Sequence, residues 1–129
     1  MKKTPLAPAD IAVMKVPNYA HGMVAEGATR WVHLSGQIGI APDGTAREGC
    51  EAQTRQAFEN IIACLRDADM TLDNVVMLRI YLVNRDDLPA LRKVRGEMFG
   101  DRLCPSTLIY VAGLVQEHWV VELEVVAAG

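Results

Sequence analysis

Hydrophobic and polar side chains alternate along residues 29–40, TRWVHLSGQIGI, with the two-residue period of a β-strand. Gly36 interrupts this alternation, which predicts a bulge or a close approach of another group to the backbone. The APDGT sequence that follows carries the proline, aspartate and glycine typical of a turn. The pattern therefore predicts a strand with an irregularity at its centre and a turn after its end.

Two longer segments have the three- to four-residue spacing of helices that bury one face. Residues 47–70 place the following side chains at helical spacing: Thr54, Phe58, Ile61, Ile62 and Leu65. Residues 85–100 place three apolar side chains on one face: Leu91, Val94 and Met98. The second segment also has residues that suit the two ends of a helix: Asp86 or Asp87, Pro89 and Gly100.

Three further segments indicate strands, at residues 74–83, 107–112 and 118–126, because they are rich in Val, Ile, Leu and Tyr. Two earlier segments, 11–16 and 20–27, predict a short strand or a hairpin. Two helices cannot cover both faces of a mixed sheet of about six strands. We therefore predict an α+β fold with both helices on one face of the sheet. The other face is expected to be polar or to pack against another subunit.

Glu122 and Glu124 lie two residues apart in the last predicted strand, VVELEVV, so both carboxylates leave the same face. One interpretation is a face in contact with water, where charged side chains are usually found. The alternative is a polar site on the face that the helices leave open. Arg79, the lone charge in the strand at 74–83, is expected on this open face too.

The composition restricts the classes of protein to which the chain can belong. Its length suits one domain, residues 1–129, and 50% hydrophobic residues are enough for a core at this size. The net charge of −3 and the lack of a basic groove argue against a nucleic-acid partner.

The cysteines and histidines suggest no metal site. The three cysteines lack metal-ligand spacing and are expected to be reduced thiols of a cytoplasmic protein. The three histidines are scattered without a metal-ligand pattern, so no metal is expected. The N-terminus lacks the apolar core of a signal peptide, and no stretch reaches the roughly 18 apolar residues of a membrane span. We therefore expect no membrane association.

Several motifs occur in a distinctive order: SGQI at residues 35–38, QTRQAFENI at 53–61, DNVVMLRIYLVNRDDLPALRKVRGEMFG at 73–100 and VELEVVA at 121–127. Their order and spacing resemble the RidA/YjgF family, whose older name is endoribonuclease L-PSP. The resemblance implies a chorismate-mutase-like α+β protomer, a homotrimer, and ligand clefts between subunits. It also implies hydrolysis of reactive imines and enamines such as 2-aminoacrylate, with no metal or cofactor.

The resemblance assigns roles to individual residues. Tyr19 matches a tyrosine that closes the cleft, although an aromatic residue that only fills an interface is an equal alternative. Gly36 matches the position where the backbone meets the ligand, and its missing side chain gives a physical reason for this. Glu122 matches the glutamate that orients water, and Glu124 resembles a supporting or interface charge.

One residue of the family pattern is missing, the arginine that holds the substrate carboxylate at the start of the penultimate strand. Ser106 or Thr107 occupies its place, depending on whether the strand is aligned through VAGL or through Pro105. Hydroxyl groups supply no charge and cannot form the bidentate contact of a guanidinium. Such a contact is worth about 10- to 100-fold in binding, so weak or undetectable activity on 2-aminoacrylate is expected.

Three other side chains near these motifs have two interpretations each. Arg92 falls where some relatives have an asparagine and could supply a cation to the cleft, or it could be an exposed helix arginine. Arg79 is a second candidate, or it pairs with Glu122 or Glu124 across the trimer. Cys104 is expected to be an inert structural thiol, because nothing near it in the sequence favours a thiolate.

Three functional hypotheses result. The first is a small-molecule hydrolase that deaminates an imine or enamine other than 2-aminoacrylate, with Glu122 positioning water. The second is a ligand-binding or regulatory trimer without catalysis, which the missing arginine favours. The third is a ribonuclease or translation inhibitor, against which the acidic charge and the 5% aromatic content argue.

Overall fold

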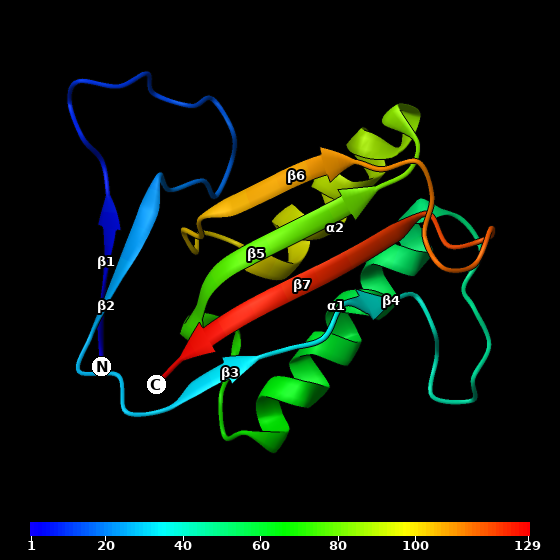
Figure 1. Cartoon of the computed structure of the whole chain (residues 1–129), viewed down its shortest axis with the longest axis horizontal. Helices are drawn as coiled ribbons and strands as arrows, with labels where there is room; N and C mark the ends of the chain where they lie inside the picture. Colours follow the sequence, from blue (N-terminus) through cyan, green and yellow to red (C-terminus); the bar gives the residue numbers. More distant parts are fainter.

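The computed structural model describes residues 1–129 (Figure 1). It contains a main sheet of five strands, two α-helices, α1 and α2, and a separate two-stranded hairpin. The sheet strands are β3 (Trp31–His33), β4 (Gln37–Ile38), β5 (Val75–Leu82), β6 (Ser106–Tyr110) and β7 (Val121–Ala128). The helices are α1 (Cys50–Asp67) and α2 (Leu88–Phe99), and the hairpin consists of β1 (Lys2–Leu6) and β2 (Gly22–Glu26). Two 3-10 turns, Leu72–Asn74 and Arg85–Asp87, precede β5 and α2.

The main sheet is mixed, as predicted. Strand β7 lies antiparallel to β5 on one side and to both β3 and β4 on the other, and β6 lies parallel to β5. Figure 1 shows α1 and α2 together on one face of this sheet. The predicted α+β fold with two helices on one face is confirmed.

The first part of the chain differs from the prediction. Strand β2 falls inside the predicted segment 20–27, but its partner is β1, at the start of the chain. Residues 11–16 form no strand. The seven strands thus divide into a five-stranded sheet and a separate hairpin, in place of one sheet of about six strands. No helix combines the length and the apolar character needed to cross a membrane.

The two faces of the sheet differ in burial because side chains alternate along each strand. Leu78, Ile80 and Leu82 of β5 are buried on the helix-facing side, and alternate residues of β7 join them: Val121, Leu123 and Val125. The intervening residues, Arg79 and Glu124 among them, lie on the open face and are only partly buried. The prediction that Glu122 and Glu124 share a face is therefore correct.

The second helix begins and ends close to its predicted limits. Pro89 lies in its first turn, and Gly100 ends it with a positive φ of 57°. Asp87 occupies the N-cap position, but its side chain forms no capping hydrogen bond, so this part of the prediction is not met.

Polar side chains of α1 fix the edge segment that contains β4. The amide of Asn60 donates to the carbonyl oxygens of Ile38, at 3.2 Å, and Ile40, at 3.0 Å. The amide of Gln53 donates to the His118 carbonyl at 2.9 Å, and its oxygen accepts from Val120 N at 3.0 Å. Because these amides satisfy backbone groups that leave the sheet ladder, they hold the β4 edge and the start of β7 against α1.

Gly39 allows this close approach, which leads to a prediction. A Cβ atom at Gly39 would lie 2.5 Å from the Cα of Gln53, which is backbone and cannot rotate away. Gly39→Ala is therefore expected to lower the free energy of unfolding by about 1–3 kcal/mol, the usual cost of overpacking. Chemical denaturation measures this loss. Gly113→Ala is the matched control, because nothing lies within 4 Å of its added Cβ. Equal stability of the two variants would contradict the prediction.

Candidate functional site

A cavity of about 330 Å³ lies between α2 and β6. Three residues singled out in the sequence line it: Tyr19, Arg92 and Ser106. The rest of its lining is mainly apolar: Met14, Val16, Leu88, Leu91, Arg95, Leu108 and Tyr110. Its volume and its mainly apolar lining with a few polar groups are typical of small-molecule sites.

Strand register decides which hydroxyl faces this cavity. Ser106 pairs with Leu78, a buried residue on the helix-facing side of β5, so Ser106 faces α2. Thr107 pairs with Arg79 and lies on the open face, where its side chain is exposed. Of the two residues that could take the place of the missing arginine, only Ser106 lines the cavity.

Backbone pairing holds Tyr19 beside β6. Tyr19 forms an isolated parallel bridge with Cys104, and Cys104 N donates to the Asn18 carbonyl at 2.9 Å. Asn18 has a positive φ of 61°, and its side-chain amide donates to the Gly100 carbonyl. The segment before β2 is therefore attached to the loop between α2 and β6, and this attachment brings Tyr19 to the cavity.

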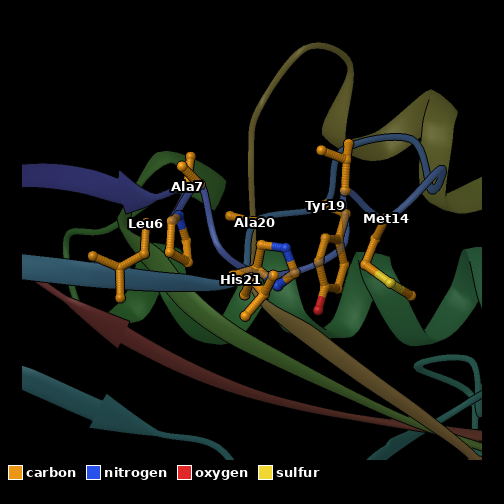
Figure 2. Close-up of a pocket in the computed structure, with 10 residues that line it drawn as sticks. Leu6, Ala7, Met14, Tyr19, Ala20 and His21 are labelled. Carbon is orange, nitrogen blue, oxygen red and sulfur yellow. The ribbon is translucent and has the colours of Figure 1, made fainter.

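A second cavity, of about 300 Å³, adjoins the first and is lined by the end of β1 and by the loop that joins β1 and β2. Figure 2 shows its lining, in which the Tyr19 ring lies beside that of His21. The two rings form an edge-to-face pair with centroids 5.3 Å apart. Tyr19 and Met14 line both cavities, so they form part of a wall shared by the two. Sequence reasoning did not anticipate this second cavity.

Arg95 is a site residue that sequence reasoning missed. It lines the first cavity together with Arg92, yet only 8% of its surface is exposed. Its Nε and Nη2 atoms are buried without a hydrogen-bond partner. Burial and the neighbouring charge of Arg92 lower the pKa of Arg95 from its ordinary value, although an arginine keeps its charge in proteins. The three-residue spacing of the two arginines in RKVR was the available signal, because it places both on one side of a helix.

Cys104 lies close to Arg95 but does not neutralise it. Burial raises the pKa of the Cys104 thiol to about 11, although the positive charges of Arg95 and Lys3 act in the opposite direction. The thiol is therefore protonated and uncharged at neutral pH. This agrees with the expectation of an inert structural cysteine.

Gly36 and Glu122 contact each other, away from this cavity. A Cβ atom at Gly36 would lie 2.7 Å from the carboxyl carbon of Glu122, so only glycine leaves room for that side chain where it lies. Glu122 forms no ion pair, whereas Glu124 accepts from Arg79 Nη1 at 2.8 Å. Arg79 thus pairs with Glu124 of its own chain, on the adjacent strand, and is not among the cavity residues. The two glutamates share a face but differ in their partners.

One chain therefore holds the predicted site residues in separate places. Tyr19, Arg92 and Ser106 line the cavity beside α2, whereas Gly36 and Glu122 lie together at β4 and β7. Thr107 lies on the open face of β6. No group of three or more His, Cys, Asp or Glu side chains is arranged to hold a metal ion.

Comparisons with known proteins agree with this architecture. The sequence model of the Endoribonuclease L-PSP family matches residues 11–129. A RutC family protein from Aquifex aeolicus is 30% identical over 127 residues, covering 97% of this chain and 95% of that protein. The crystal structure of YyfB, a Rid family protein of unknown function from Yersinia pestis, has a TM-score of 0.86 at 25% identity and 100% coverage of both chains.

A relative that bears the RidA name is also similar. RidA from an Antarctic Psychrobacter species has a TM-score of 0.74 at 31% identity, covering 89% of this chain and 94% of its own. Because the family match spans most of the chain, the resemblance carried by the motifs is confirmed. This chain belongs to the Endoribonuclease L-PSP family, also known as the RidA/YjgF family.

Proposed function

We propose that this protein hydrolyses a reactive imine or enamine metabolite other than 2-aminoacrylate, in a cleft completed by a neighbouring subunit. The observation that carries the proposal is the cavity between α2 and β6. It combines an apolar lining with the polar groups of Tyr19, Arg92 and Ser106, and it is large enough for a small metabolite. Membership of the family supports the same class of chemistry.

The separation of the site residues supports a site shared between subunits. The cavity lining contains no carboxylate that could act as a base, and Glu122 lies elsewhere without an ion-pair partner. In the proposed homotrimer, Glu122 and Gly36 of one subunit would face Tyr19, Arg92 and Ser106 of the next. The carboxylate would then orient water beside a substrate that the second subunit holds.

The proposed reaction balances without an oxidant or reductant. Water oxygen bonds to the imine carbon, and the water proton passes to Glu122. Glu122 returns that proton to the nitrogen, which gives a neutral carbinolamine. The carboxylate then accepts the hydroxyl proton and passes it to the nitrogen as the C–N bond breaks, so that ammonia leaves and a carbonyl forms. Donors such as the Tyr19 and Ser106 hydroxyls could steady the charge that develops on nitrogen or oxygen.

Trapping of imines tests this activity. An amino-acid oxidase would generate imino acids with different side chains in the presence of semicarbazide, which captures each imine before it hydrolyses. A hydrolase is expected to lower the yield of trapped product for at least one side chain. If no yield falls at equimolar protein while small ligands still bind the cavity, the second hypothesis, a non-catalytic ligand-binding trimer, replaces this one.

Assembly gives a separate prediction. Light scattering is expected to give three times the protomer mass of 14.1 kDa. Another subunit would cover the open face of the sheet and would bring the separated site residues together. A stable monomer at micromolar concentration would exclude the shared cleft.

A further inference from the structure

Arg95 is a buried cation without a counter-ion. Only 8% of its surface is exposed, and its Nε and Nη2 atoms are buried without a hydrogen-bond acceptor. A guanidinium has five N–H donors and stays charged at physiological pH. Removal of one partner from a buried charged pair is strongly destabilising, so an unpaired guanidinium at this depth requires an explanation.

The surroundings of Arg95 supply no negative charge. Neither the cavity between α2 and β6 nor the small adjoining cavity that Arg95 also lines contains an aspartate or glutamate. The two ionisable groups that act on the charge of Arg95 are the Cys104 thiol, which is protonated at neutral pH, and Arg92, which carries a like charge. Two arginines therefore face the same cavities with nothing to neutralise them.

We propose that Arg95, together with Arg92, binds the carboxylate of a small ligand with an apolar body in the cavity between α2 and β6. A carboxylate accepts two hydrogen bonds from one guanidinium, which would satisfy the two orphan nitrogen atoms. The apolar lining of Leu88, Leu91 and Leu108 suits the body of such a ligand better than it suits a phosphate or a sugar.

This inference names the substrate class of the proposed function. In the family pattern the carboxylate contact comes from the start of the penultimate strand, where this chain has Ser106 or Thr107, whereas the two arginines that line the cavity come from α2. The charge-binding end of the cavity is thus displaced from strand to helix. A carboxylate bound at α2 lies in a different part of the cavity from one bound at the strand. For its reactive carbon to reach the same place as that of 2-aminoacrylate, the substrate must therefore be a longer or bulkier acid.

Calorimetric titration with a stable probe pair tests the proposal. The probes are 3-phenylpropanoate and its neutral amide, 3-phenylpropanamide, which differ in charge but hardly in shape. The intact protein is expected to bind the acid more tightly than the amide. Arg95→Met is expected to weaken binding of the acid by about 10- to 100-fold and to leave the affinity for the amide unchanged. Arg66→Met is the matched control, because Arg66 is an exposed arginine on the other helix.

A second readout separates a binding role from a structural one. If Arg95 awaits a ligand, Arg95→Met removes a buried unpaired charge and is expected to raise or maintain the melting temperature of the ligand-free protein. A lowered melting temperature, or loss of the assembly in sizing, would show that Arg95 pairs with a carboxylate of a neighbouring copy and would overturn the proposal. Equal binding of acid and amide by the unaltered protein, or tighter binding of inorganic phosphate than of the acid, would also overturn it.

These measurements involve no turnover, so they are independent of the catalytic proposal. A protein that binds the acid through Arg95 but hydrolyses no imine would contradict only the proposed function. If the wild-type protein and Arg95→Met lower the yield of trapped imine equally, only the inference drawn from Arg95 is contradicted.

Discussion

Glu122→Gln is expected to lower the turnover of an imine substrate by about 100- to 10,000-fold, the usual contribution of a positioned general base. The amide is nearly isosteric with the carboxylate, so ligand affinity and assembly should change little. The amide is a far poorer proton acceptor, however, and cannot take the proton of the attacking water. Turnover of the substrate found by imine trapping, measured beside sizing of both proteins, checks this result.

Glu124→Gln is the matched control for Glu122→Gln. Both glutamates lie on the same strand and the same face, but Glu124 already pairs with Arg79 at 2.8 Å. Its replacement is expected to lower the turnover rate less than Glu122→Gln does and to weaken the association of the subunits. Loss of turnover in Glu124→Gln with normal turnover in Glu122→Gln would reverse the assigned roles. Dissociation of both variants would mean that the carboxylates serve only the interface.

Gly36→Ala extends the same test without replacing the carboxylate. The added Cβ would lie 2.7 Å from the carboxyl carbon of Glu122, and the flexible glutamate side chain would have to move aside. We expect turnover to fall while stability changes little, because the displaced group is the end of a side chain. Unchanged turnover would show that the observed position of Glu122 is not the one that the reaction uses.

The wild-type protein is expected to hydrolyse 2-aminoacrylate at least 10- to 100-fold less efficiently than relatives that have the strand arginine. That factor corresponds to the loss of about 1.5–3 kcal/mol of charge-assisted hydrogen bonding. Ser106→Arg is expected to raise the activity, because Ser106 faces the cavity and a guanidinium there could bind the carboxylate. A coupled assay, in which a dehydratase releases 2-aminoacrylate, measures the rate.

Thr107→Arg controls for added charge alone. Thr107 is the next residue on β6 but lies on the open face, so its arginine would point away from the cavity. Only Ser106→Arg should gain activity. Robust turnover by the wild-type protein would show that the strand arginine matters less than its chemistry suggests, and a gain in Thr107→Arg would contradict the assignment of faces.

Periodicity predicted the helices and strands whose own sequences contain regularly spaced apolar residues. Both helices and the two long strands, β5 and β7, carry enough apolar residues at the right spacing to be recognised. Strand β1, Lys2–Leu6, could not be recognised in this way. Its sequence KKTPL contains two lysines and a proline, and its strand conformation depends on pairing with β2, which is distant in sequence.

The candidate site was only partly predictable for the same reason. That Glu122 and Glu124 share a face follows from the two-residue period, but the pairing of Arg79 with Glu124 follows from the register between β5 and β7. Arg95 was not singled out from the sequence, because an arginine on a helix is usually exposed. Its burial depends on the segment Val16–Asn18, which lies against α2 and, with Arg95, lines the small cavity there. Such contacts between distant segments cannot be derived from spacing along the chain.

The position of β6 at the edge of the sheet has an evolutionary consequence. Because β6 pairs only with β5, a shift of its register by one residue would exchange every side chain between its two faces. Where such a shift accompanied the insertion or deletion of one residue in the preceding loop, Thr107 and Ile109 would face the cavity in place of Ser106 and Leu108. Substrate preference in this family could therefore diverge through changes in loop length alone, without any substitution inside the cleft.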